Sequence, residues 1–206
     1  MYHFILYNQE KTNTMELIFA THNQHKLEEV KQMLPQAIQF KSLTEINFLD
    51  EIEETGETFI ENARIKAQTI FQKTGVNVFA DDSGLVIEGL NGAPGVYSAR
   101  YAGTGKSEDN IAKVLEEMKE IENRKAYFIA VFCLILNGEE HFFEGRVNGT
   151  ISNEILGADG FGYDPIFIPD GYTESFAQMT AEQKNSMSHR GRAVEKLNDY
   201  LTKINA

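Results

Sequence analysis

The chain has 206 residues, a formal net charge of −12 and a single cysteine. Its hydrophobic content of 42% and charged content of 24% are those of a folded globular protein and exclude disorder as the main state. The negative charge argues against a nucleic-acid polymer as partner, because backbone phosphates are bound by clustered lysine and arginine. It leaves open a single nucleotide held by a few local cations and a metal ion.

Cysteine usage and hydropathy bear on the compartment. Cys133 has no partner for an internal disulfide, which is typical of the reducing cytoplasm. It lies in an apolar run, 126–136, and is expected to be buried and inert. No run is long enough to cross a membrane, so we expect no membrane partner. Residues 1–14 lack the pattern of a signal peptide and are interpreted as an extension of uncertain order, followed by one domain over 15–206.

The first half of the chain alternates strands and helices. A short strand is predicted over 16–20, followed by a polar loop and an amphipathic helix that ends near residue 34, before Pro35. Another strand is predicted over 37–41. A longer helix begins after Thr58, which forms a capping box with Glu61, and ends at Gly75.

Two adjacent carboxylates follow the next buried strand. The runs 76–80 and 85–90 read as strands, so Asp81, Asp82, Ser83 and Gly84 are expected to form a turn between them. Acids at a strand end are costly unless a cation lies opposite, and a divalent metal with a phosphate-bearing substrate is the usual solution. An Asp-rich surface turn is the alternative from these residues alone.

The second half is predicted to be mainly antiparallel. Its expected elements are a Gly-rich stretch over 89–105, a helix capped by Ser107, a central strand over 127–136 joined by the Asn137-Gly138 turn to a strand over 141–146, a Gly/aromatic loop over 157–169 and a closing helix over 191–204. Together the two halves predict an α/β class with a mixed sheet.

One phosphate-binding pattern is interpreted as a coincidence. Residues 103–107, Gly-Thr-Gly-Lys-Ser, resemble the end of a P-loop, but Arg100 stands where that motif requires glycine. We therefore expect a turn that leads into a helix.

Four separate segments carry side chains suited to one kind of chemistry. Residues 21–26 follow the first strand, where backbone N–H groups and a lysine can hold phosphate. Glu53 and Glu54 could complete a metal site with Asp82. Aromatic rings in 160–165 could stack a base, and donors cluster over 184–190. Taken singly, each segment is also typical of a solvated surface or of core packing.

In their order along residues 15–203, these segments resemble the inosine triphosphate pyrophosphatase family. The matching text is Thr21-x-Asn23-x-x-Lys26, Glu53-Glu54-Thr55-Gly56-x-Thr58-Phe59-x-Glu61-Asn62-Ala63-x-x-Lys66-Ala67, Ala80-Asp81-Asp82-Ser83-Gly84-Leu85, Gly95-x-Tyr97-Ser98-Ala99-Arg100-Tyr101, Gly160-Phe161-Gly162-Tyr163-Asp164-Pro165 and Ser188-His189-Arg190-Gly191.

The resemblance implies an elongated two-lobed α/β fold, with a long mixed β-sheet flanked by helices, a central nucleotide-binding cleft and a homodimer. It implies Mg²⁺-dependent hydrolysis of ITP, dITP and XTP to the monophosphate and pyrophosphate. By position, Asp82 is the implied general base and metal ligand, and Glu53 is the other metal carboxylate. The implied substrate contacts are Thr21, His22, Asn23, Gln24, His25, Lys26, Lys66, Ser83, Phe161, Gly162, Tyr163, Asp164, Lys184, His189 and Arg190.

Some points stay open at this stage. His22 stands where the family often has glycine, so a left-handed backbone there would be harder to adopt. The alternatives are a pyrophosphatase for other modified nucleotides and a catalytically silent nucleotide sensor, which the retention of Asp82, Glu53 and Lys66 opposes. The sequence does not identify the residue that excludes guanine, nor whether Asp81 ligates metal.

Overall fold

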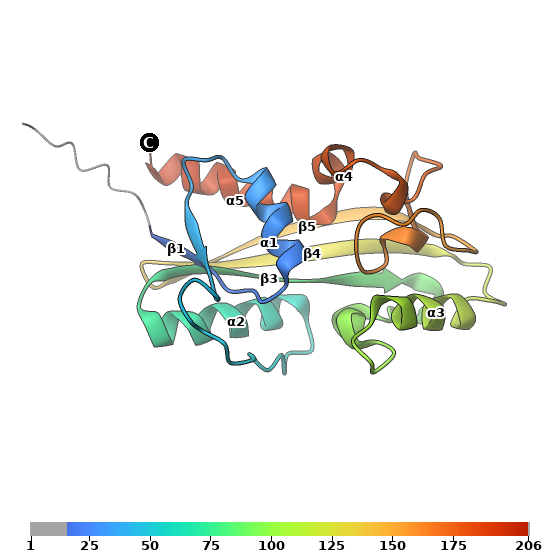
Figure 1. Cartoon of the computed structure of the whole chain (residues 1–206), viewed down its shortest axis with the longest axis horizontal. Helices are drawn as coiled ribbons and strands as arrows, with labels where there is room; N and C mark the ends of the chain where they lie inside the picture. The colour runs from blue at the N-terminus through green and yellow to red at the C-terminus, as the bar shows by residue number, and fades with distance from the viewer. Residues whose placement is uncertain (1–15, 206) are drawn as a thin grey trace, which may run out of the picture.

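A computed structural model describes residues 16–205, and the predicted extension over 1–14 lies outside this part of the chain. Its centre is a mixed sheet of six strands in the order β2-β1-β3-β4-β5-β6. Strands β2, β1 and β3 are parallel, and β3 to β6 are antiparallel. The sheet and its flanking helices form an elongated molecule (Figure 1). The predicted α/β class with a mixed sheet is confirmed.

The strands are β1 (Leu17–Phe19), β2 (Phe40–Ser42), β3 (Asn77–Ile87), β4 (Lys125–Leu136), β5 (Glu139–Ile151) and β6 (Phe167–Pro169). The helices are α1 (Gln24–Met33), α2 (Phe59–Thr74), α3 (Ser107–Glu117), α4 (Ala181–Met187) and α5 (His189–Asn205). Short 3₁₀ turns are η1 (Glu88–Leu90), η2 (Gly95–Arg100), η3 (Asp164–Ile166) and η4 (Phe176–Gln178).

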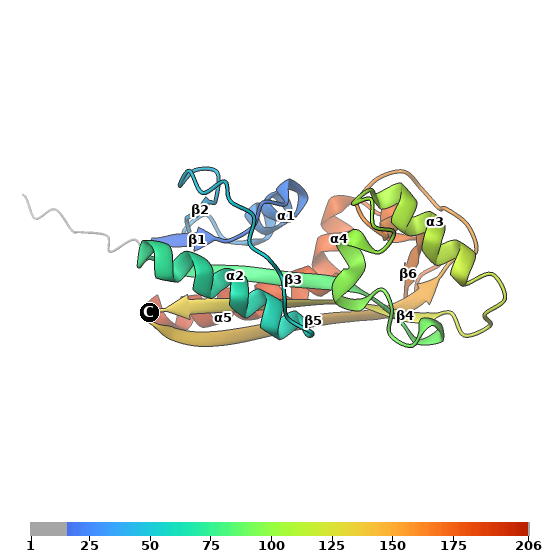
Figure 2. The same cartoon turned by 90° about the horizontal axis from the view of Figure 1, so that it is seen from below.

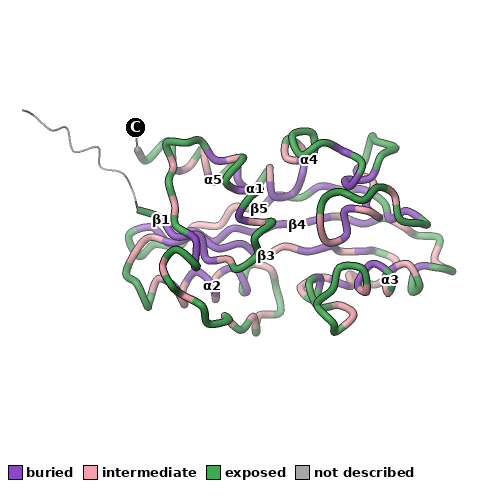
Figure 3. Tube along the Cα trace, in the orientation of Figure 1, coloured by how far each residue is buried: buried purple, intermediate pink, exposed green. Residues whose placement is uncertain are grey.

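Strand alternation sends successive side chains to different helices. Phe79 of β3 and Phe132 of β4 lie in the core cluster under α1 and α5, while Val78 and Cys133 lie in the cluster under α2. Figures 1 and 2 show α2 and α5 on opposite faces of the sheet. Cys133 is buried, as predicted, and burial raises the pKa of its thiol to about 12. The central strands are accordingly buried on both faces (Figure 3).

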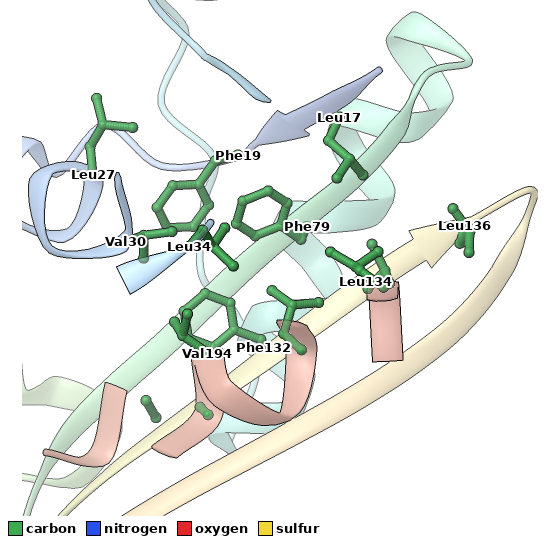
Figure 4. Close-up of a cluster of buried hydrophobic side chains, with 14 residues drawn as sticks. Leu17, Phe19, Leu27, Val30, Leu34, Phe79, Phe132, Leu134, Leu136 and Val194 are labelled. Atoms are coloured by element: carbon green, nitrogen blue, oxygen red, sulfur yellow. The ribbon is translucent and has the colours of Figure 1, made fainter. Parts of the chain in front are cut away.

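The core under α1 and α5 is built on stacked phenylalanines (Figure 4). The Phe79 ring is stacked against Phe19, with 4.6 Å between centroids, and against Phe132 at 6.3 Å. A separate cluster at the far end of the sheet contains Phe128 and Phe167, which meet edge to face at 4.7 Å.

The boundaries of α2 agree with the sequence. The Thr58 hydroxyl accepts a hydrogen bond from the Glu61 N–H, the Glu61 carboxylate accepts from the Thr58 N–H, and Gly75 ends the helix at a φ of 67°. The left-handed conformation at Gly75 is one that glycine adopts at no steric cost. This helix is therefore fixed at both ends by local signals.

The predicted turn at residues 81–84 is wrong. Strand β3 runs without interruption from Asn77 to Ile87, and Asp81 and Asp82 pair with Phe132 and Val131 of β4. The long antiparallel partner supplies the hydrogen-bond ladder that local sequence does not encode. Gly84 allows this strand to pass close to η2, since a Cβ there would lie 2.5 Å from the Gly95 carbonyl oxygen.

Smaller expectations also differ. The strand predicted over 37–41 is β2, which begins at Phe40, and the strand predicted over 141–146 is the longer β5, Glu139–Ile151. The predicted strand over 85–90 ends at Ile87, where η1 begins. Ser107 is the first residue of α3 rather than its cap, because Lys106 occupies that position without a side-chain bond. Helix α5 begins at His189, two residues before the predicted start. Residues 103–106 lead into α3 as a turn, as predicted, with Gly103 and Gly105 at positive φ.

Replacement of Phe79 by alanine is expected to lower the free energy of unfolding by about 3–5 kcal/mol, because it leaves a cavity between two stacked rings. Ile60→Ala, at a side chain that is 41% exposed, should cost about 1 kcal/mol or less. Urea denaturation measures both. Equal losses in the two variants would contradict the importance of this stack.

Candidate active site

The candidate site lies along β3, beyond the point where its pairing with β1 ends. Strand β1 pairs with only the first residues of β3, Asn77–Phe79, and the last backbone bond joins the Ala20 N–H to the Phe79 carbonyl at 2.8 Å. Further along, this edge of β3 next meets a neighbour at the Val86–Pro94 bridge. A cavity of about 560 Å³ lies along the open edge between these two points. Side chains from both faces of the sheet line this cavity.

Most of the predicted site residues meet in this cavity. Its lining includes Thr21, His22, Asn23, Lys26, Lys66, Asp82, Ser83, Phe161, Gly162, Tyr163, Asp164, Lys184, His189 and Arg190. Gln24, His25 and Glu53 do not line it. Residues that are more than 160 positions apart in the chain, such as Lys26 and Arg190, thus line the same cavity.

Asp81 is held on the face covered by α1 and α5. Its Oδ2 lies 3.0 Å from Lys26 Nζ and 3.6 Å from Arg190, and its side chain does not line the cavity. Burial alone would raise the pKa of Asp81, but the two cations hold it below its usual value. Asp81 therefore serves as a buried counter-charge that fixes Lys26 and Arg190.

Asp82 points to the opposite face and into the cavity. Its Oδ1 accepts from the Ser83 N–H at 2.9 Å and lies 3.7 Å from Lys66 Nζ, while its Oδ2 accepts from the Asn62 amide at 3.1 Å. Burial raises the pKa of Asp82, and Lys66 opposes that shift. A carboxylate in this environment is suited to accept a proton from water at neutral pH.

The acidic loop places Glu54 toward Asp82. Glu54 lines the cavity and forms ion pairs with Lys66 and, at 3.4 Å, with Arg100. Glu53, the metal carboxylate implied by the family resemblance, is exposed and does not line the cavity. Exposed and half-buried residues alternate along 51–56, with Glu53 exposed and Glu54 half-buried. Glu54 is thus the one of the two glutamates that pairs with Lys66.

The loop after β1 forms the start of α1 and one wall of the cavity. Asn23 caps α1 by accepting a hydrogen bond from the Lys26 N–H at 3.1 Å. The free N–H groups and positive dipole at this end favour an anion. His22 avoids the left-handed conformation that the family's glycine suggested, and its Nε2 lies 3.0 Å from the Asp50 carbonyl oxygen. Burial lowers the pKa of Lys26, although Asp81 opposes this shift.

Gln24 and His25 lie outside the main cavity. Gln24 donates to Glu28 along the exposed face of α1. The His25 ring stacks on Phe161 at 5.1 Å between centroids and helps to orient that aromatic side chain. His25 thus packs behind Phe161, which is a predicted substrate contact.

Cations surround Phe161 at the other end of the cavity. Lys184 Nζ lies 4.7 Å from the centre of the Phe161 ring, and the Arg190 guanidinium carbon lies at 5.5 Å. Lys184 donates to Asp164 at 2.6 Å and to Glu29 at 2.8 Å, and Arg190 also pairs with Glu29. Burial raises the pKa of Asp164, against the effect of Lys184. This network connects α1 to α4 and α5.

His189 and Tyr163 complete this end. The His189 ring stacks on Phe128 at 4.7 Å, and its buried Nδ1 has no hydrogen-bond partner among the described residues. Burial and the nearby Arg190 and Lys184 charges lower the pKa of His189 well below its usual value, so the imidazole is neutral at pH 7. Tyr163 donates its hydroxyl to the Ser98 carbonyl oxygen at 2.9 Å. The apolar surfaces of Phe128 and Tyr163 suit the faces of a flat ring.

Sequence reasoning did not assign roles to Asn62, Glu29, Ser98 or Phe128. A signal was present for Asn62 and Glu29, because both are polar residues next to the apolar stripes of predicted helices. Nothing comparable marked Phe128, which reads as an ordinary strand residue. Its role depends on the distant His189.

The site contains the ligands expected for a metal held jointly with a substrate. Among residues 16–205, no group of three or more histidine, cysteine or acidic side chains forms a ready-made metal site. Mg²⁺ typically uses one or two carboxylates together with phosphate oxygens and waters. Asp82 and Glu54 fit that requirement.

No helix within residues 16–205 is long and apolar enough to span a membrane.

The chain is similar to known proteins of one family over most of its length. The Ham1 family model matches residues 17–200. The dITP/XTP pyrophosphatase of Christiangramia forsetii is 48% identical over 190 residues, which cover 92% of this chain and 100% of that protein. The protein of the same name from Bacillus subtilis is 49% identical over 191 residues, covering 90% and 96%.

Solved structures share the fold. A HAM1 protein from Coxiella burnetii has a TM-score of 0.85 and 41% identity, and the Staphylococcus aureus Ham1 protein has a TM-score of 0.84 and 38% identity. Each alignment covers 92% of this chain and 99% of the other. The fold and family implied by the sequence motifs are thereby confirmed.

The buried, neutral His189 predicts a pH-dependent stability. The unfolded chain binds a proton at this residue below about pH 6.5 while the folded chain does not, so lowering the pH destabilises the fold by up to about 1.4 kcal/mol per pH unit. His189→Gln should remove this part of the slope between pH 6.5 and pH 5. Chemical denaturation of both proteins across that range measures it, and parallel slopes would contradict a neutral His189.

Proposed function

The chain belongs to the Ham1 family, and from this premise we propose that it hydrolyses non-canonical purine nucleoside triphosphates, namely ITP, dITP and XTP, to the monophosphate and pyrophosphate. The observation that carries the proposal is one cavity with two chemically distinct ends. Asp82 and Lys66 lie at one end, and His189 lies at the other among aromatic rings. The first end suits phosphate chemistry and the second suits a base.

The proposed reaction breaks the bond between the α- and β-phosphates. Asp82 accepts a proton from the attacking water, which becomes a better nucleophile. Lys66 and Lys26 supply fixed positive charge for the phosphate oxygens, where negative charge develops. The Coulombic attraction of Asp82 and Glu54 outweighs the burial of Lys66 and raises its pKa, so this lysine stays charged.

We propose Mg²⁺ as the cofactor, held by Asp82 and Glu54. When bound, Mg²⁺ neutralises phosphate charge and orients the triphosphate. The positions of the two carboxylates support this proposal, because Glu54 and Asp82 both pair with Lys66. The retained base and lysines also oppose the alternative of a silent nucleotide sensor.

Base selection is proposed to depend on donors at the aromatic end. Lys184 has only donors, and the Arg190 Nε is buried without a hydrogen-bond partner among the described residues. A donor here pairs with the 6-oxo group of hypoxanthine or xanthine but opposes the 6-amino group of adenine. An unpaired buried polar group makes such discrimination large.

Two further proposals rest on the family resemblance and on the composition. The protein is proposed to act as a homodimer in the cytoplasm, where its unpaired Cys133 stays reduced. Sedimentation velocity tests the dimer and cell fractionation tests the location.

A substrate panel tests the activity. Pyrophosphate release with Mg²⁺ is measured for ITP, XTP, dITP, GTP, ATP and pyrimidine triphosphates at equal concentration. We expect fast release from the first three and little from the others. Asp82→Asn should lose turnover, whereas Asp199→Asn, at an exposed position on α5, should retain it. Preference for a modified pyrimidine would replace this proposal with the alternative nucleotide class, and binding without release would favour the sensor.

The two adjacent glutamates provide a matched test of the metal site. Glu54→Gln should raise the Mg²⁺ concentration for half-maximal rate on the order of tenfold or more, because a metal carboxylate is lost. Glu53→Gln should leave this concentration nearly unchanged, since Glu53 is exposed. Calorimetric titration of Mg²⁺ with a non-hydrolysable nucleotide provides a second readout. The reverse order of effects would assign the metal to Glu53.

A further inference from the structure

Asn62 is a completely buried polar residue in the first turns of α2. Its backbone N–H continues the helix by donating to the Thr58 carbonyl at 3.1 Å. A side-chain amide at such a position is costly unless its donors and acceptor are paired. The hydrogen-bond partners of the Asn62 amide therefore indicate its role.

The two ends of the Asn62 amide have different partners. Its Oδ1 accepts from the Gly56 backbone N–H at 2.8 Å, and its Nδ2 donates to Asp82 Oδ2 at 3.1 Å. The orientation is fixed by chemistry, because the Gly56 N–H can only donate and an ionised carboxylate can only accept. A flipped amide would oppose both partners.

The Gly56 contact fixes the acidic loop to α2. A Cβ at Gly56 would lie 2.7 Å from Asn62 Oδ1 and 2.6 Å from the Glu61 Cβ, so the loop approaches the helix more closely than any other residue type allows. Glu54 is only two residues before this anchor. Its position beside Lys66 consequently depends on where Asn62 holds Gly56.

The Asp82 contact fixes the carboxylate plane. Oδ1 is engaged by the Ser83 N–H and Oδ2 by Asn62. One anchor would allow the side chain to rotate about its last torsion, whereas two anchors on different oxygens define its orientation. The remaining lone pairs are then presented to the cavity in a constant direction.

We propose that Asn62 is a positioning residue, whose amide holds the Asp82 carboxylate and the Glu54 loop in one fixed arrangement around the reacting phosphate. This inference rests on the proposed function, in which Asp82 accepts the proton of water. Asn62 itself is not proposed to touch substrate or the attacking water. It acts through Asp82 and through Gly56.

Asn62→Asp separates the two contacts. The variant keeps an oxygen that can accept from Gly56 but replaces the amide donor to Asp82 by a carboxyl group, which either repels Asp82 or shares a proton with it, and both prevent Asp82 from acting as before. We expect kcat for ITP to fall on the order of 10²-fold, as for other misplaced catalytic groups, while KM changes little because the substrate contacts remain. Asn62→Ala removes both contacts and should lose at least as much kcat.

Hydrogen exchange tests the contact between Asn62 and Gly56 and does not depend on turnover. Residues 51–57 should exchange faster in Asn62→Ala than in the wild type, and Asn62→Asp should retain most of the protection. Asn77→Ala is the control, because Asn77 lies on the strand that carries Asp82 but does not line the cavity, and its side chain accepts from the Asn137 N–H at 2.7 Å. It should reduce stability while leaving kcat and loop exchange unchanged.

The outcomes are distinct. If the wild type turns over ITP and Asn62→Asp retains more than half of its kcat, the inference is overturned; if Asn62→Asp does not fold, full kcat in Asn62→Ala overturns it equally. A wild type without turnover refutes the proposed function instead. In that case unchanged exchange of the loop in Asn62→Ala overturns the inference, and faster exchange supports its loop contact.

Discussion

The alternation of side chains along β3 is the constraint on which the site depends. Asp81 and Asp82 are neighbours in an uninterrupted strand, so their carboxylates must point to opposite faces of the sheet. Asp81 meets Lys26 of α1 and Arg190 of α5, and Asp82 meets Asn62 and Lys66 of α2. One strand therefore fixes cations from both helical layers. A turn at this position would have left both carboxylates free and the two layers unconnected.

The short β1 makes this arrangement useful. If β1 continued beyond Phe19, its backbone would cover the edge of β3 beside Asp82 and would close the cavity. Its early end instead exposes that edge, and the chain turns into the capped N-terminus of α1, where free N–H groups favour an anion. The phosphate end thus combines a strand carboxylate and a helix terminus, neither of which depends on loop flexibility. The parallel strands β1 and β2 end here, at the position where open α/β sheets usually bind ligands.

The sequence predicted elements whose signals are local and missed those whose cause lies elsewhere in the chain. The capping box at Thr58, the stop at Gly75 and the Asn137-Gly138 hairpin were predicted because a few adjacent residues determine each one. The continuity of β3 through Asp82 could not be, since the pairing with β4 overrides a local turn pattern. That Glu54 rather than Glu53 pairs with Lys66 likewise depends on a loop that is joined to α2 by the bond from the Gly56 N–H to Asn62. Motif order located the cavity residues, but only the fold showed that Asp81 serves as a counter-charge.

The same ion pairs that hold the cavity together also prepare it for a charged substrate. Lys66, Lys184 and Arg190 are each paired with carboxylates, so none is an unpaired buried charge before a nucleotide enters. In the proposed function, a triphosphate would compete with Glu54 for Lys66, and a 6-oxo group would compete with Asp164 for Lys184. In each case the donor changes partners without being moved into place, which keeps the cost of reorganisation low. The displaced carboxylate of Glu54 would then be available to the proposed Mg²⁺, so the loss of one partner would supply a ligand for the other charge that the proposed reaction requires.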